Sequence, residues 1–386
     1  MVKKRVFLAT CAVLFAFLLL LPAGAEEATG AAESVEESGF GAIREFRESL
    51  PPEVTALLPD GFFGEDPETV ASAVQNAADV PKILAYIRDF LGVSLRQALP
   101  LLAAVSGILV LSAVLRAVGA TSGAGTGRAF SFCSVTVLTL LLLRQSLSGV
   151  SRLRAWFEML CTLAGSMLPM MGTLYALGGN VGAAAANHTV MSAFLSVAQM
   201  LCTRAVLPVA GICLLLAVCD ALTGRAALKP LGNLIKRTFT LGFSFLMLLL
   251  SFLLGLQTTL AAGSDTLALR TVRFAAGSFL PVVGGSVSEA MKTVAGSISY
   301  LRTLAGSGGI LVLFLFFLPT FLTVLTTRIV FLLCGALAEL LEAKSEGRVL
   351  SELASVYGFF LAVIAAVFTM AVFALTIFAH CAVAGG

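Results

Sequence analysis

Six stretches of the sequence are long and apolar enough to cross a lipid bilayer, and they constrain the fold more than any other feature. A helix needs about 20 predominantly apolar residues to span the hydrocarbon core. The six stretches are residues 98–118, 129–149, 188–222, 239–262, 308–334 and 355–381. Hydrophobic residues make up 58% of the chain and charged residues only 12%, whereas soluble domains average about half and about a quarter. The sequence therefore predicts an all-α integral membrane protein with six or more transmembrane helices, not a soluble enzyme.

Two further segments, 155–180 and 268–304, are less clearly membrane-spanning. The first is apolar enough to cross a bilayer. The second contains four charged side chains, which are costly in hydrocarbon. They are Arg270, Arg273, Glu289 and Lys292. The simplest topology makes both segments extracytoplasmic re-entrant or interfacial stretches. The span count rises if 188–222 and 305–338 are hairpins broken at their prolines.

The N-terminus has the pattern of a secretory signal peptide over residues 1–25. Basic residues 3–5 precede an apolar core at 6–21, and Pro22 then precedes small residues at 23–25. Cleavage after Ala25 fits this pattern. An uncleaved first anchor is the alternative.

Residues 26–97 form a polar, mostly acidic segment that we expect to be extracytoplasmic and partly disordered, with short helices. Residues 26–37 have a composition typical of disorder, and 40–47 fit a short helix. Leu50-Pro-Pro-Glu and Leu58-Pro-Asp-Gly are turn signals. A second helix is predicted over 68–92, bent or split at Pro81. Its apolar face is predicted to contact the membrane surface or a partner, or to pack internally. It comprises Val70, Val74, Ala77, Leu84 and Ile87.

The membrane part, residues 98–386, contains an internal repeat. Residues 164–172 match 276–284 at an offset of 112, and at the same offset Gln145 falls on Gln257. Pro208 falls within one residue of Pro319. Internal duplication is common in transporter folds. We therefore predict two repeats, at about 129–222 and 241–334, each with a Pro/Gly-broken segment.

Basic residues orient the predicted spans. Arg116 and Arg128 flank the loop after the first span, and the predicted loop 223–238 holds four basic residues and no acid. Such loops mark the cytoplasmic side, and both precede the corresponding helix of their repeat, so the repeats are predicted to be parallel. Three arginines on the outer side count against this topology. They are Arg144, Arg152 and Arg154.

No motif for catalysis, metal binding or a cofactor is present. The glycine-rich stretch at 121–128 lacks the Lys-Ser/Thr pair of a phosphate-binding loop, and the two histidines have no partner at motif spacing. The eight cysteines show no ligand spacing. The net charge of +3 gives no sign of nucleic-acid binding. We predict no catalytic residue, no metal and no cofactor.

Candidate functional residues are therefore the Pro/Gly segments and the polar groups at membrane depth. Non-helical backbone within a membrane lines cavities in channels and carriers, although a kink or close helix packing is an equal alternative. The candidate pathway or gating residues are Pro169, Gly172, Gln257, Gly277, Pro281, Gly284 and Gly285. The candidate intramembrane polar residues are Asp220, Asp265, Arg270 and Glu289, which as helix-end groups alternatively reach the interface.

The stretch from Ala268 to Ser297, which includes Ala276-Gly-Ser-Phe-Leu-Pro-Val-Val-Gly-Gly, resembles the signature of stage III sporulation protein AE. The resemblance extends over most of the chain. It implies a multi-pass protein of the mother-cell membrane around the forespore, encoded with companion membrane proteins and an ATPase. Together these are thought to form a channel or feeding apparatus. The resemblance supplies no catalytic residue.

Three functions are open as hypotheses on these observations. The first is a non-enzymatic subunit of that transenvelope complex, whose Pro/Gly segments line or gate a path while 26–97 contacts partners. The second is a stand-alone secondary transporter in which Asp220, Asp265 or Glu289 couples an ion. The third is a membrane scaffold that conducts nothing.

Overall fold

The computed structural model describes residues 32–64, 67–121, 124–177, 230–245 and 304–381, and scattered helical positions at 192–219, 248 and 252. The chain divides into two compact units, Met1–Ser34 and Val35–Gly386, and nearly all of the described residues belong to the second. Within the described ranges all regular structure is helical. The elements are α2 (Ala32–Ser49), α3 (Pro52–Thr55), α4 (Pro67–Ala77), α5 (Val80–Thr121), α6 (Ala124–Leu177), α11 (Gly309–Leu340) and α12 (Lys344–Cys381), with π-helical turns at Cys202–Val206 and Leu304–Gly308.

Four of these helices are long and apolar enough to cross a membrane, namely α5, α6, α11 and α12. They contain the predicted spans 98–118, 129–149, 308–334 and 355–381, which confirms an all-α membrane protein. The predicted spans 188–222 and 239–262 are described only at scattered positions, so they stay predictions.

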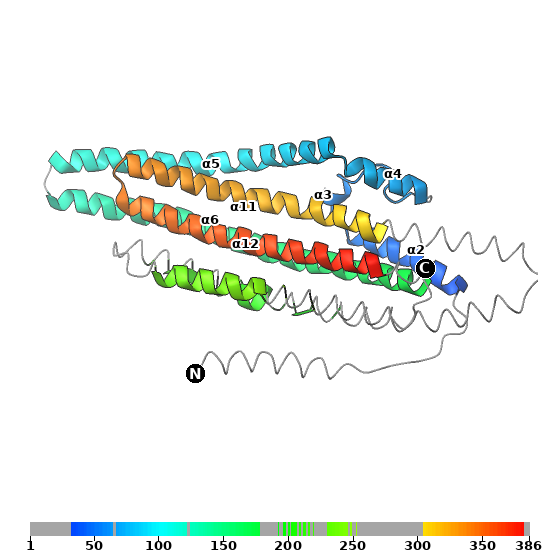
Figure 1. Ribbon diagram of the computed structural model, residues 1–386. Helices are drawn as coiled ribbons and strands as arrows, with labels where there is room; N and C mark the ends of the chain where they lie inside the picture. The colour runs from blue at the N-terminus through cyan, green and yellow to red at the C-terminus, as the bar shows by residue number, and fades with distance from the viewer. Residues whose placement is uncertain are drawn as a thin grey trace, which may run out of the picture. The chain divides into compact units, whose positions relative to one another are not determined.

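Taken in chain order, the four long helices run in alternating directions. Ser94 of α5 lies beside Thr323 of α11, and Arg116 lies beside Glu342 at the end of α11, so α5 and α11 run parallel. Helix α6 runs against α11, because Trp156 stacks on Phe316 while the residues before it approach the later part of α11. Figure 1 shows α11 (yellow to orange) and α12 (orange to red) side by side, joined by a short turn.

Helix α6 is continuous over 54 residues, a length of about 81 Å at about 1.5 Å per residue. Residues 155–180 were expected to form an extracytoplasmic re-entrant or interfacial segment. Their described part, 155–177, contains no re-entrant turn and continues the helix of 129–149. Pro169 lies inside α6 without ending it. An interior proline removes one backbone hydrogen bond, but buried Leu163, Met167 and Met170 hold this part of the helix in the core.

The N-terminal helices α2, α3 and α4 pack around Phe46, Phe62 and Val70, each at most 1% exposed. The turn at Leu58-Pro-Asp-Gly is confirmed, and Gly61 has φ +85°, a conformation that favours glycine. Helix α4 ends at Ala77 and α5 begins at Val80, so the split near Pro81 is also confirmed.

Two expectations about this segment change, and one alternative that the sequence left open is decided. Residues 32–37, expected to be disordered, belong to α2, whereas 26–31 lie outside the described residues. The apolar face of α4 packs internally, because Val70, Val74 and Ala77 are buried, although Leu84 is 63% exposed. The predicted boundary at 97/98 falls inside α5, which crosses it without a break.

Helix α2 docks on α6. The Ser49 hydroxyl donates to Ser166 Oγ at 2.7 Å, and Ser166 in turn donates to the carbonyl of Leu163. The N-terminal segment is therefore packed on the long helices rather than separate from them.

Candidate functional site

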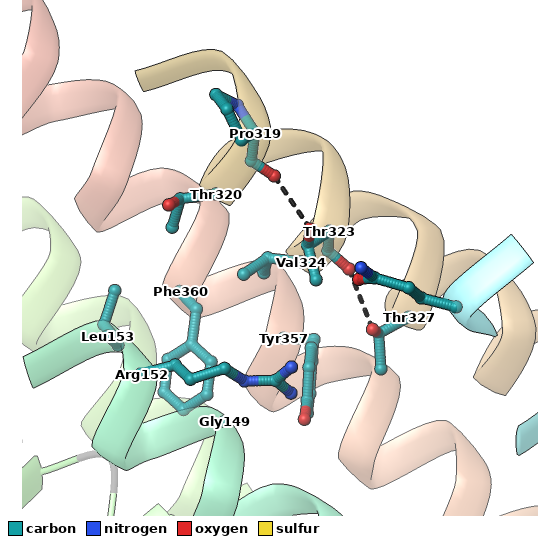
Figure 2. Close-up of a pocket in the computed structure, with 11 residues that line it drawn as sticks. Gly149, Arg152, Leu153, Pro319, Thr320, Thr323, Val324, Thr327, Tyr357 and Phe360 are labelled. Atoms are coloured by element: carbon teal, nitrogen blue, oxygen red, sulfur yellow. Dashed lines mark hydrogen bonds between the residues drawn. The ribbon is translucent and has the colours of Figure 1, made fainter. Parts of the chain in front are cut away.

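A cavity of about 340 Å³ lies between α5, α6, α11 and α12. Figure 2 shows side chains from α6, α11 and α12 converging on it. Its walls are apolar at Leu153, Val324 and Phe360. Its polar lining residues are Gln97, Arg152, Thr320, Thr323, Thr327 and Tyr357.

Helix α11 contributes a ladder of hydroxyl groups that begins one turn after Pro319. Thr323 donates to the carbonyl of Pro319 at 2.8 Å, and Thr327 donates to the carbonyl of Thr323 at 2.8 Å. Residues three or four apart share one helix face, so these hydroxyls line the same side of the cavity. Ser94 of α5 reaches the ladder, with its Oγ 3.4 Å from Thr323 Oγ1.

Tyr357 of α12 lies at the buried floor of the cavity and is only 2% exposed. A Cβ atom on Gly149 of α6 would lie 2.7 Å from its hydroxyl oxygen, so the absence of a side chain there makes room for the phenol. Ser146 and Arg152 lie near the hydroxyl. Neither the Tyr357 nor the Ser146 hydroxyl oxygen has a hydrogen-bond partner among the described residues, and both oxygens are buried. Buried polar groups normally have partners, so this pair of hydroxyls is an exception in the described part of the structure.

Arg152 and Gln97 are exposed and stand at the mouth of the cavity. In Figure 2 the Arg152 guanidinium extends from α6 toward the ring of Tyr357. Arg154, two residues later, instead pairs with Glu158 on the same helix at 2.8 Å. No carboxylate is among the described residues that line the cavity, which therefore presents a positive charge and the oxygens of threonine hydroxyls.

A second arginine lies next to the cavity. The guanidinium of Arg328 covers Gly358, where an added Cβ would lie 3.1 Å from its Cζ. Its buried Nε has no hydrogen-bond partner in the described part of the chain. The region around Tyr357 thus has more positive than negative charge among the described side chains.

Buried ion pairs lie nearer the α11–α12 turn. Lys236, in the helical residues 230–245, donates to Ser355 Oγ at 2.7 Å and lies 3.5 Å from a carboxylate oxygen of Glu352. Residues 230–238 were expected to be a loop and are helical. Phe239 packs edge-on against Phe359, so this helix lies against α12.

Ser112 of α5 donates to Glu346 at 2.7 Å, and Arg116 lies 3.7 Å from the other carboxylate oxygen. Arg116 also donates to the carbonyls of Leu341 and Glu342. These carbonyls at the end of α11 lack partners within the helix, so Arg116 caps α11 and holds the turn against α5.

Of the residues predicted from the sequence, the structure places Pro169 and Gly172. Both lie in α6, about 26 Å or more along the helix from Arg152, and neither lines the cavity. The other candidates lie outside the described residues: Asp220, Gln257, Asp265, Arg270, Gly277, Pro281, Gly284, Gly285 and Glu289.

The sequence analysis did not predict Gly149, Thr323 or Tyr357 as site residues, and it noted Arg152 only as evidence against the predicted topology. Two sequence features could have indicated this site: the threonines spaced three to four residues apart after Pro319, and an arginine within an apolar stretch. Across the described residues, no cluster of three or more His, Cys, Asp or Glu side chains fits a metal ion.

Comparison with known proteins identifies the family. The sequence model of the family described as stage III sporulation protein AE matches residues 68–382, which is most of the chain. The chain belongs to the stage III sporulation protein AE family. The match includes all four long helices and the cavity between them, so the cavity lies in the part that the family shares.

One curated relative is the stage III sporulation protein AE of Bacillus subtilis (strain 168), which is 24% identical over 148 residues. The alignment covers 38% of this chain and 37% of the relative. No solved structure matches. Family membership supports a role in sporulation, and the relative's name states no ligand or partner.

Proposed function

We propose that this protein is a non-enzymatic membrane subunit of a transenvelope channel or feeding apparatus between mother cell and forespore, and that it helps small solutes pass. The observation that supports this best is the cavity between four apolar helices, with a charged mouth and a buried unpartnered hydroxyl. Polar groups at membrane depth are expensive and typically mark pathways. Membership of a sporulation family supports the biological setting.

The proposed topology has a signal peptide at 1–25, six full spans, and two parallel repeats at about 129–222 and 241–334. The contact of Arg116 with the α11–α12 turn supports it, because the first and last pairs of long helices then connect at the same end of the bundle. Lys236 pairs with Glu352 toward that same end, as a predicted cytoplasmic basic segment should. Residues 268–304 are proposed to stay on the outer side.

The proposed location is the mother-cell membrane around the forespore, with residues 26–97 outside the cytoplasm. The proposed partners are the companion membrane proteins of the sporulation channel complex, including an ATPase subunit, and no nucleic acid. The docking of α2 on α6 supports a rigid platform on the outer side to which such partners bind.

Filling the cavity tests the proposal. Thr320→Phe places an aromatic ring in the cavity, whereas Val137→Phe on α6 changes a side chain that is 54% exposed. We expect Thr320→Phe to abolish sporulation at normal membrane levels of the protein, and Val137→Phe to preserve it. Normal sporulation of Thr320→Phe, with normal membrane levels, would show that this cavity is not a path.

Substitutions outside the cavity separate the alternatives. Asp220→Asn, Asp265→Asn or Glu289→Gln should abolish an ion-coupled transporter and spare a passive conduit. Pro169→Ala and Pro281→Ala should impair a path gated at those prolines. If all of these and Thr320→Phe sporulate normally, the scaffold alternative is favoured.

A further inference from the structure

We infer that the cavity between α5, α6, α11 and α12 binds a small oxyanion, a carboxylate or a phosphate, with Arg152 supplying the charge and Tyr357 a hydrogen bond. This inference deepens the proposed function, on which it depends, by giving the chemical class of the solute. It is tested by binding to the purified protein, which does not require a sporulation phenotype.

The positive charge at the mouth of the cavity favours a ligand with a negative charge. Arg152 lines the cavity, and no Asp or Glu does so among the described residues. Neither Arg152 nor Arg328 forms an ion pair with a described carboxylate, in contrast to Arg116 and Arg154. A guanidinium group matches the planar oxygens of carboxylates and phosphates with paired N–H donors.

The buried floor contains a hydroxyl whose hydrogen-bonding capacity is unused in the described part of the structure. The Tyr357 hydroxyl is buried and has no partner among the described residues, and the same is true of the Ser146 hydroxyl. A buried hydroxyl without a partner is destabilising, and an oxyanion that accepts a hydrogen bond from it removes that penalty. Gly149 allows this arrangement, because an added Cβ would lie 2.7 Å from the Tyr357 oxygen.

The walls determine the size and polarity of the rest of the ligand. Leu153, Val324 and Phe360 are apolar, and the volume is about 340 Å³, at the lower end of the range of about 300–1,000 Å³ usual for small-molecule sites. A compact organic acid, a phosphate ester or the headgroup of an anionic lipid shares the required chemistry. A cation is disfavoured by Arg152 and Arg328 together.

The protein contains its own reporter for this site. Trp156 is the single tryptophan of the chain and lies one helical turn after Arg152. It stacks on Phe316 with centroids 5.8 Å apart, and its indole N–H reaches the Phe316 carbonyl at 3.5 Å. Movement of α6 against α11 on binding should therefore change the fluorescence of the whole protein.

The test uses the full-length protein purified in a neutral detergent, titrated with sodium phosphate or sodium glutamate against sodium chloride at equal ionic strength. We expect a saturable change in Trp156 fluorescence and a rise in the apparent thermal unfolding midpoint, Tm, with at least one of the oxyanions. Arg152→Gln should weaken binding about tenfold or more, and Tyr357→Phe by several-fold. Arg154→Gln is the matched control, because Arg154 pairs with Glu158 outside the cavity, and it should bind as the wild type does.

A second arm distinguishes the source of the anion. Nanodiscs containing phosphatidylglycerol are compared with nanodiscs of phosphatidylcholine alone. An Arg152-dependent response that appears only in phosphatidylglycerol nanodiscs assigns the site to a lipid headgroup. An Arg152-dependent response to free oxyanions assigns the site to a solute. Arg152→Lys, which keeps the charge, controls for misfolding of Arg152→Gln.

Two results would overturn the inference. One is the absence of both the fluorescence and the Tm response to free oxyanions and to anionic lipid. The other is a response that is unchanged in folded Arg152→Gln. If either result occurs while Thr320→Phe still blocks sporulation, the proposal that the cavity is a solute path is kept, and only its assignment to oxyanions fails.

Discussion

Lys236 and Glu352 form an ion pair of 3.5 Å, and their side chains are only 9% and 7% exposed. The pair connects the basic segment 230–238 to the charged first turns of α12. Removing one partner from such a pair leaves an uncompensated buried charge, at a cost of about 3–5 kcal/mol, whereas replacing both with apolar residues is often neutral.

Lys236→Met should therefore lower the apparent Tm strongly in detergent, and Lys236→Met with Glu352→Leu should restore most of the loss. Circular dichroism of the helical signal during heating measures both. The neighbouring exposed Arg237→Met is the control and should change little. Equal effects of Lys236→Met and Arg237→Met would contradict the buried pair.

Gly149→Ala should destabilise the protein by about 1–3 kcal/mol, the usual range for an added group in a packed core, because its Cβ would lie 2.7 Å from the Tyr357 oxygen. Gly165→Ala in the same helix has no atom within 4 Å of the added Cβ and should be neutral or slightly stabilising, since alanine favours helix. Adding Tyr357→Phe should rescue Gly149→Ala. The Tm values of these three variants and of the wild type give this comparison, and a lack of rescue would place the strain elsewhere.

Tyr357→Phe alone should raise the apparent Tm of the ligand-free protein. It removes a buried hydroxyl that has no hydrogen-bond partner among the described residues, worth about 1 kcal/mol or more. The same variant should bind oxyanions more weakly. A loss of both stability and binding would instead indicate that the hydroxyl has a structural partner.

Arg116 and Glu346 should be energetically coupled, because both hold the α11–α12 turn against α5. In a double-mutant cycle of Arg116→Met and Glu346→Gln, we expect a coupling of about 0.5–3 kcal/mol. Loss of Arg116 should also expose the turn Leu341–Ala343 and speed tryptic cleavage after Lys344. Additive effects and unchanged cleavage would argue against this contact.

Cysteines at positions 49 and 166 should form a disulfide in a background in which the eight native cysteines are replaced. The two hydroxyl oxygens are 2.7 Å apart, close to the geometry that a disulfide requires. Mobility in non-reducing and reducing gels detects the link. The pair Ser49→Cys and Ser151→Cys, about 22 Å away along α6, should remain reduced, and a link there would show that α2 does not dock as described.

Hydropathy predicted the spans well where a segment is uniformly apolar, as in α11 and α12. It failed to predict that 129–149 and 155–177 form one helix. The polar stretch around Arg152, Arg154 and Glu158 suggested a boundary, and Pro169 suggested a break. Contacts between distant segments, such as Trp156 with Phe316, hold that stretch helical, and a local pattern contains no information about them.

The cavity was harder to predict for the same reason. Its lining comes from four helices, and its key contact joins a glycine and a tyrosine 208 positions apart in the chain. A glycine in an apolar helix predicts close packing but not the group that approaches it. The sequence analysis also singled out polar groups, but at other positions, most of which lie outside the described residues.

The length of α6 has a consequence for assembly. A crossing of a hydrocarbon core of about 30 Å uses about 39 Å of helix even at a tilt of about 40°, and α6 is about 81 Å long. Roughly half of it must then stand clear of the hydrocarbon as an unbroken rod that α2 braces at Ser166. The length of α6 would therefore set how far from the bilayer a protein docked near Leu177 lies.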